Sequence, residues 1–295
     1  MQKVKIIAVI CFAFFVKLFV FQPFVIPSSS MDRTLIKGDY VMVNKWQNSL
    51  FGNQLNIQKG NIIAFHYPLE KVSINDKRVF IKRCVANPGD TLVIENGETS
   101  SDYASLQFDY IFSDSDKILS WEILKEFGIH LGGRVSNDRW ILSLDSLQMR
   151  AILSVDSNFV FNRNIQHEGT TEISTFPSDG NLHWNRDYYG PLIIPQKGMK
   201  VKLDTSNLKI YQKIISEYEN HSISLNKDTI ILDGRIENTY VFEQNYYFML
   251  GDNRHHSQDS RYWGFVPEDH IIGDCSVILF NAEDFSFNRF LKTVD

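Results

Sequence analysis

The chain has 295 residues, which is enough for one large domain or two modest ones. Hydrophobic residues make up 43% of it and suffice for a substantial core, while the net charge of −5 argues against binding to nucleic acid or another polyanion. Three cysteines exclude a disulfide framework; a bridge between Cys84 and Cys275 competes with two buried free thiols, which we favour.

The chain opens with a hydrophobic segment over residues 6–26, IIAVICFAFFVKLFVFQPFVI, which is about long enough to cross a bilayer as a helix. Lys3 and Lys5 precede it and predict a cytoplasmic tail over residues 1–5, with the remainder of the chain outside. Lys17 interrupts the segment, so either its ammonium snorkels or the buried span ends near it. A cleaved secretory signal fits the composition about as well as an anchor, because small residues follow the segment.

Short strand-like runs dominate the rest of the chain, separated by Gly, Pro and Asn. Helical periodicity is scarce: SNLKIYQKIISEYEN predicts a helix that Ser206 can cap, and SWEILKEFGI is a weaker candidate. No stretch after the first segment is long enough to span a membrane. The predicted strands are YVMVNKW, NIIAFHYP, RVFIKRCV, TLVIENG, KVKLD, TIILDG, NYYFMLGD and SVILF.

Residues 99–190 differ from the segments on either side. They are rich in Ser, Asp and Asn and show no sustained period. We interpret them as an insertion in a β-scaffold that residues 27–98 and 191–295 build. The predicted architecture is a mostly β domain that this insertion interrupts. The domain follows one N-terminal membrane helix and lies outside the membrane.

Three stretches that lie far apart in sequence carry side chains suited to chemistry: PSSSMDRTLIKGD, VFIKRCVANPGD and MLGDNRHHSQDSRYWGFVP. Together they offer serines and a lysine, and a serine hydroxyl needs a base before it can act as a nucleophile. If VFIKRCV is a strand, Lys82 shares one face with Phe80 and Cys84. Burial among apolar groups lowers a lysine pKa from its usual value of about 10.4, so Lys82 is a candidate general base.

Each stretch by itself has a simpler interpretation. Serines beside a hydrophobic segment usually form a linker, and a lysine in a strand usually faces solvent or protects an edge. The GDNR and DSR residues alone would equally suit a loop tied by Asp–Arg pairs. His255 and His256 suggest a metal site, but no third ligand stands at a useful spacing, so we expect exposed loop histidines.

In their order and wording, the three stretches resemble the sequence boxes of the bacterial type I signal peptidases, which are membrane-anchored endopeptidases with a serine and a lysine in the active site. The longest box, Gly-Asp-Asn-Arg-x-x-Ser-x-Asp-Ser-Arg-Tyr-Trp-Gly-x-Val-Pro, is matched without a break. GNIIAFHYP resembles another box, with Asn61 in place of its acid. The matched positions are residues 27–31, 34–35, 38–39, 81–83, 88–90 and 251–267.

The resemblance implies a role for each matched residue. It implies Ser30 as the nucleophile, Lys82 as its general base, and Ser28 as an oxyanion donor together with the Ser30 backbone N–H. It implies that Ser257 orients the lysine by a hydrogen bond. Scaffold pairs are implied for Asp259 with Arg261 and, more loosely, for Asp252 with Arg254. The apolar residues implied to line pockets for small substrate side chains are Phe24, Ile26, Met31, Leu35 and Ile81.

The fold class that the resemblance implies is a mostly β, membrane-anchored domain of signal-peptidase type. Its implied activity is that of a serine endopeptidase which removes signal peptides from exported preproteins after Ala-x-Ala-like residues, through an acyl-enzyme and without a cofactor or a metal. Retention of the anchor is favoured, because cleavage at residues 28–30 would destroy the site. The implied location is the bacterial plasma (inner) membrane, in a single pass with the catalytic domain on the periplasmic side. Expected partners are preproteins and the lipid bilayer; contact with the export machinery is allowed, and nucleic acid is not expected.

The chain departs from the family pattern at a few positions. Arg33 stands where many members have proline, and Cys84 and Ala86 replace residues that are usually aliphatic and glycine. The resemblance is strong over residues 1–98 and 185–280 and poor between them. The alternative is a non-enzymatic, membrane-tethered envelope binding or assembly protein on the same scaffold, against which the intact Ser30 and Lys82 argue. A repressor-type Ser/Lys peptidase would share the chemistry but would not need an anchor.

Overall fold

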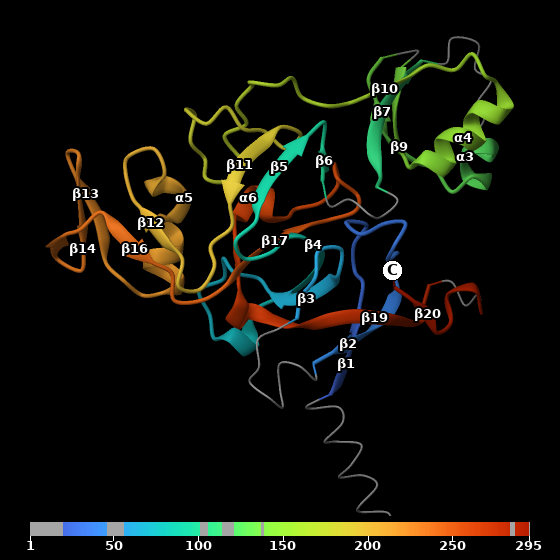
Figure 1. Cartoon of the computed structure of the whole chain (residues 1–295). Helices are drawn as coiled ribbons and strands as arrows, with labels where there is room; N and C mark the ends of the chain where they lie inside the picture. The colour runs from blue at the N-terminus through green and yellow to red at the C-terminus, as the bar shows by residue number, and fades with distance from the viewer. Residues whose placement is uncertain are drawn as a thin grey trace, which may run out of the picture.

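A computed structural model describes residues 20–45, 56–100, 106–113, 121–136, 139–283 and 287–294, and over these residues strands predominate (Figure 1). The main sheet has the strand order β1-β2-β19-β3-β4-β17-β18, and β20 pairs with β19. The expectation of a mostly β chain is confirmed. The strands of the main sheet are β1 (Phe21–Val25), β2 (Asp39–Asn44), β3 (Ile62–His66), β4 (Val79–Ala86), β17 (Tyr246–Leu250), β18 (Val266–Pro267), β19 (Ile271–Asn281) and β20 (Lys292–Thr293).

Strand β1 corrects the end of the predicted membrane segment. Phe21–Val25 lie within the 6–26 span that we expected to be helical, yet they form an extended strand that pairs antiparallel with β2. Pro23 explains the difference, since β1 is the edge of the main sheet, where a residue without an N–H is tolerated. Residues 1–19, which hold the expected cytoplasmic tail and most of the expected anchor, lie outside the described residues. Among the residues that are described, none of the helices has the length and hydrophobicity to cross a bilayer.

Smaller sheets flank the main one. The first follows β4 directly and has the order β11-β5-β6, with β5 at Thr91–Glu95, β6 at Glu98–Thr99 and β11 at Tyr189–Ile193. On the far side from the insertion lie β12 (Lys200–Lys202) with β16 (Thr239–Val241), and the hairpin β13 (Ile223–Asn226), β14 (Thr229–Leu232) and β15 (Arg235–Ile236) (Figure 1). Short helical turns are η1 (Ile74–Asp76), α6 (Ser260–Trp263), η3 (Glu268–His270) and η4 (Phe287–Arg289).

The helix predicted from SNLKIYQKIISEYEN is present but begins differently from the expectation. It comprises α5 (Leu208–Lys213), which continues directly into a π-helical turn, η2 (Ile214–Tyr218). Ser206 does not cap it: Asn207 occupies the N-cap position, and the backbone N–H groups of both residues donate to the Asp204 carboxylate. Asp204 therefore supplies the side-chain oxygen at the start of this helix that we expected from Ser206.

The segment predicted to be an insertion contains an ordered unit of its own. Its sheet has the order β10-β7-β9-β8, with β7 at Phe108–Ser113, β8 at His130–Arg134, β9 at Arg139–Leu144 and β10 at Phe161–Arg163. Two helices cover it, α3 (Trp121–Glu126), which confirms the weaker helix prediction, and α4 (Ser146–Val155). A separate apolar cluster that includes Phe112, Leu142 and Ile152 forms its core. We call this unit the insertion sheet; it lies to one side of the main sheet (Figure 1).

The main sheet separates two apolar clusters. One contains Ile26, Met31 and Leu35 with residues of β2 and β19. The other contains Phe65, Cys84 and Trp263 with residues of β17. Cys84 and Cys275 are both buried free thiols, as favoured from the sequence. Their burial raises the pKa of each thiol, which keeps both in the protonated, unreactive form.

Candidate active site

Ser30 lies in a tight turn that directly follows the edge strand β1. The turn is closed by backbone hydrogen bonds from Asp32 to Ser29 and from Leu35 to Met31, at 3.0 and 2.8 Å. Asn253 holds it from the other side, because its backbone N–H donates to the Ser30 carbonyl at 3.2 Å and its side-chain amide donates to the Ser29 carbonyl at 3.1 Å. The Ser30 side chain is 8% exposed, so its hydroxyl borders solvent while its backbone is fixed.

Lys82 lies at the centre of β4 and points at this turn. Its Nζ donates a hydrogen bond to Ser30 Oγ, although 52 residues separate the two in sequence. The side chain is 3% exposed, and Nζ lies 5.9 Å from the centre of the Phe80 ring. Burial lowers the pKa of Lys82 from 10.5 to about 8, outweighing the opposing charges of Asp259 and Asp252. A lysine in this state is in part neutral near pH 8 and able to accept a proton.

The remaining predicted polar residues lie close by, with one expected bond missing. Ser28 Oγ is 3.3 Å from Ser30 Oγ, which places a second hydroxyl beside the first. Ser257 does not make its expected bond to Lys82: its Oγ is buried and forms no hydrogen bond to the lysine. The lysine instead donates to Ser30, and Ser257 packs against Gly251, where any larger residue would overlap its side chain.

Asp259 and Arg261 form the buried pair that the sequence predicted. The guanidinium donates to both carboxylate oxygens, at 2.8 and 2.9 Å, and both side chains are fully buried. Burial alone would raise the pKa of Asp259, but the charge and hydrogen bonds of Arg261 lower it. Asp259 also accepts from the Gly251 N–H at 3.2 Å, so the pair fixes the loop between β17 and α6.

The expected pairing of Asp252 with Arg254 is wrong, because each of the two side chains binds another group. Both Asp252 oxygens accept from Arg83, at 2.8 and 2.7 Å, and one also accepts from Thr34 Oγ1 at 2.6 Å. Arg254 donates instead to the carbonyl oxygens of Gly251 and Gly97. Arg83 lies on the opposite face of β4 from Lys82. Its ion pair with Asp252 connects β4 to the loop after β17.

An apolar cleft of about 540 Å³ opens beside Ser30 and Lys82. Four of the five predicted substrate residues line it, namely Phe24, Ile26, Met31 and Ile81. Leu35 does not; it is fully buried and belongs to the core cluster below the cleft. The resemblance implied a pocket role for Leu35 because it is an apolar residue near the first sequence box, but the fold directs its side chain into the core.

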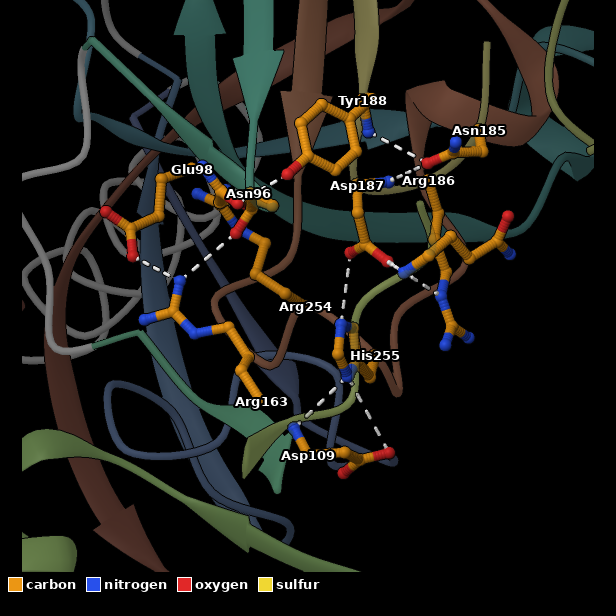
Figure 2. A network of polar contacts seen from close by, with 12 residues as sticks. Asn96, Glu98, Asp109, Arg163, Asn185, Arg186, Asp187, Tyr188, Arg254 and His255 are labelled. Carbon is orange, nitrogen blue, oxygen red and sulfur yellow. Dashed lines mark hydrogen bonds and ion pairs between the residues drawn. The ribbon is translucent and has the colours of Figure 1, made fainter. Parts of the chain in front are cut away.

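The two adjacent histidines have roles that the sequence did not reveal. His255 was expected to be exposed, but its side chain is buried between Asp187, at 3.1 Å from Nε2, and the backbone N–H of Asp109, which donates to Nδ1 at 3.1 Å (Figure 2). His256 is 39% exposed and borders the cleft. A hydrogen bond to Asp109, 2.9 Å long, raises the pKa of His256. Neither histidine belongs to a metal-binding cluster in the part of the chain that is described.

Arg83 and Asn253 are further residues that we overlooked. Arg83 follows the candidate base Lys82 directly in sequence. If the strand is buried on both faces, the charged Arg83 side chain requires an acidic partner. That requirement was the available signal for the Arg83–Asp252 pair. Asn253 gave no such signal, because only the fold brings its amide to the carbonyl of Ser29.

The chain is similar in sequence to known proteins of one kind. A family model described as "Signal peptidase, peptidase S26" matches residues 2–165 and 193–280. A signal peptidase I of Aquifex aeolicus is 26% identical over 282 residues, covering 96% of this chain and 84% of the relative. One from Haemophilus influenzae is 25% identical over 303 residues, covering 97% and 73%, and one from Buchnera aphidicola (Acyrthosiphon pisum) is 25% identical over 271 residues, covering 88% and 68%.

Proposed function

This chain belongs to the signal peptidase family, peptidase S26, and on that premise we propose that it is a serine peptidase whose nucleophile is Ser30 and whose general base is Lys82. The observation that carries the proposal is the contact between Lys82 Nζ and Ser30 Oγ in a buried setting that lowers the lysine pKa to about 8. Its substrates are preproteins that carry signal peptides.

The reaction follows from the positions of these groups. Neutral Lys82 takes the Ser30 hydroxyl proton while Oγ attacks the scissile carbonyl carbon, which gives a tetrahedral oxyanion and an ammonium on Lys82. The Ser28 hydroxyl and the Ser30 N–H, which donates to no group among the described residues, bind the oxyanion. Lys82 then protonates the leaving amine, and in the second half it activates the water that hydrolyses the acyl-enzyme.

The lining of the cleft supports a preference for particular residues before the scissile bond. Met31 and Ile26 are almost fully buried behind its surface, and Ile81 forms part of the wall on the β4 side. These aliphatic walls favour small apolar side chains, as in Ala-x-Ala sequences, and a charged side chain there would lose its hydration without a partner. Phe24 extends the wall along β1.

We place the enzyme in the bacterial plasma membrane, in a single pass with its N-terminus cytoplasmic and the described domain on the outer face. The support is the hydrophobic segment with Lys3 and Lys5 before it. Strand β1 begins at Phe21, so Ser30 comes only ten residues after Val20, the last residue before the strand. This short separation would hold Ser30 close to the bilayer surface, where a signal peptide's cleavage site emerges.

The test replaces each member of the dyad and measures cleavage of a preprotein in detergent. Ser30→Ala and Lys82→Ala should each lower kcat by about 10⁴-fold or more, because the two residues act as one unit. Ser29→Ala is the matched control: its side chain is exposed, its neighbours in the turn are unchanged, and its kcat should stay within about threefold of wild type. If either dyad variant cleaves at the wild-type rate, the assignment fails. If the wild-type protein cleaves no preprotein, a binding or assembly role on this scaffold is supported instead.

A further inference from the structure

The turn that carries Ser30 is held by an element outside the main sheet. Arg33, three residues after Ser30, forms an ion pair with Asp145 of the insertion sheet. Asp145 lies between β9 and α4, and its side chain is fully buried. Its other oxygen accepts from the Gln148 N–H at 2.7 Å and caps α4, so the carboxylate is fixed in place.

Arg33 has a backbone conformation that needs such support. Its φ is +78°, in the left-handed region that side chains other than Gly, Asn and Asp seldom adopt. A residue held there is strained and persists only where its surroundings impose the conformation. The Asp145 carboxylate is such a constraint, because a fully buried carboxylate without a cation would be far less stable.

A second connection reaches the same turn through Asn253. The Gln107 N–H donates to the Asp252 carbonyl, and the Arg254 N–H donates to the Gln107 carbonyl, both at 3.0 Å, so Gln107 pairs with the Asn253 loop as a parallel bridge. The Gln107 side chain donates to the carbonyl of Ser143, at the end of β9, at 3.0 Å. Asn253 in turn binds the carbonyls of Ser29 and Ser30.

Both connections therefore end at the same short segment, residues 143–145 at the end of β9. We propose that the insertion sheet positions the nucleophile turn, with Arg33 and Asp145 as positioning residues for Ser30. This inference rests on the proposed function, because it concerns how Ser30 is aimed at Lys82. It gives the insertion a part in catalysis without contact to the substrate.

The experiment is a double-mutant cycle with Arg33→Ala and Asp145→Asn, assayed for preprotein cleavage. Asparagine at 145 keeps an acceptor for the α4 cap but removes the charge. Each variant should lower kcat by about ten- to a hundredfold, since displacing a reacting group by about 1 Å costs up to that factor, with KM within about threefold of wild type. The kcat of the double variant should be no lower than that of the more impaired single variant, because both changes remove the same connection. Arg33→Lys, which keeps the charge at a partly exposed position, should recover part of kcat.

Two measurements separate positioning from general loosening of the fold. The acid-side midpoint of the kcat/KM profile should remain where it is in wild type, whereas hydration of Lys82 in a loosened site would move it upward. Glu98→Gln is the matched control, since it removes the ion pair with Arg163 of β10 while leaving the Ser30 turn untouched, and its kcat should stay within about twofold.

The inference is overturned if Arg33→Ala and Asp145→Asn keep kcat within twofold of wild type, if their losses add in the double variant, or if the acid-side midpoint shifts with them. Should Asp145→Asn fail to fold, the Arg33→Ala and Arg33→Lys pair gives the same test. If Ser30→Ala remains active, the proposed function itself is wrong. If Ser30→Ala is inactive while Arg33→Ala is fully active, only this inference fails.

Discussion

Lys82 is buried, and few groups replace the hydration that its ammonium loses on burial. Asp259 and Asp252 favour the charged form, but burial outweighs them and lowers the pKa to about 8. The only hydrogen bond of its Nζ among the described side chains is the one donated to Ser30. A charged lysine at this position therefore destabilises the folded chain, and a neutral one is the form that the proposed general base requires.

This lysine predicts the pH dependence of cleavage. Because only the neutral amine can accept the Ser30 proton, kcat/KM should rise about tenfold per pH unit below about pH 8 and level off above it. The pKa of His256 is raised by its hydrogen bond to Asp109, but among the described residues this histidine makes no hydrogen bond to Ser30 or Lys82, so its titration should add at most a minor step. Rates of preprotein cleavage between pH 5.5 and 9.5 would check the profile. A rate that stays constant from pH 6 to 9 would contradict Lys82 as the base.

The same pKa predicts an effect on stability. The folded-state pKa of about 8 lies below the unfolded value of 10.5, so between these values the unfolded chain binds the proton that the folded chain lacks. Stability from this group is therefore lowest below pH 8 and increases as the pH rises to about 10.5. Lys82→Met, of similar shape but uncharged, should raise the free energy of unfolding at pH 7 by about 1–3 kcal/mol while abolishing cleavage.

Urea unfolding of Lys82→Met at pH 7 and at pH 10.5 would measure this effect. The gain should shrink to near zero at the higher pH, where wild-type Lys82 is neutral in the folded chain and about half of it is neutral in the unfolded chain. Lys37→Met is the control, since Lys37 is exposed and its replacement should change stability by less than about 0.5 kcal/mol at either pH. A Lys82→Met protein that is less stable than wild type at both pH values would show that its ammonium is not destabilising.

At the scale of single elements, the positions of most strands were predictable from the sequence, but their pairing and the burial of the loop residues between them were not. Short runs of strand-favouring residues bounded by Gly, Pro and Asn predicted β2, β3, β4, β5, β12, β14, β17 and part of β19. The helical interpretation of Phe21–Val25 failed, since hydrophobic content alone does not distinguish a membrane helix from an edge strand. His255 is buried for a tertiary reason: its partners Asp109 and Asp187 lie 146 and 68 residues away.

The candidate site shows the same division. Ser30, Lys82 and the Asp259–Arg261 pair stand in recognisable sequence patterns, and the structure brings them together. The partner of Asp252 was misjudged, because proximity in sequence favoured Arg254 whereas the sheet register places Arg83 opposite Leu250, directly before the loop. Side-chain direction within a turn, which removed Leu35 from the cleft, is likewise set by packing rather than by pattern.

The loop from Gly251 to Asp259 is the element on which the site depends most closely. A Cβ at Gly251 would overlap the Ser30 carbonyl and the Ser257 side chain. Gly251→Ala should therefore displace the nucleophile turn, lower the free energy of unfolding by about 1–3 kcal/mol and reduce kcat by at least about tenfold. Gly180→Ala is the matched control, because nothing lies within 4 Å of its Cβ position. Thermal unfolding and kcat of both variants would check this, and equal behaviour of the two would refute the close contact.

At the scale of the whole molecule, the site is built where separate packing units meet. Ser30 comes from the turn after β1, Lys82 from the centre of the main sheet, and the loop that joins them from the chain after β17. The insertion sheet has a core of its own, centred on Phe112 and Leu142, and contacts this assembly through Gln107, Asp109 and Asp145. We therefore expect folding of the main sheet and alignment of Ser30 to be separable properties of one chain.

Removal of the insertion sheet tests that separation. Arg163 donates to the Asn96 carbonyl and to Glu98, so the two ends of the unit lie close together, and a linker of about six residues can replace residues 106–163. The two apolar clusters of the main sheet, and a third that contains Tyr189, Phe242 and Phe248, include none of the removed residues, so the shortened chain should unfold in a single cooperative transition. Its kcat should fall by at least as much as in Arg33→Ala, because the Gln107 and Asp145 connections are both lost. Introducing Arg33→Ala into the shortened chain should then cause no further loss, since its partner is absent. Calorimetry together with kcat for the four proteins would decide, and a shortened enzyme that folds and cleaves at the wild-type rate would show that the main sheet aligns Ser30 unaided.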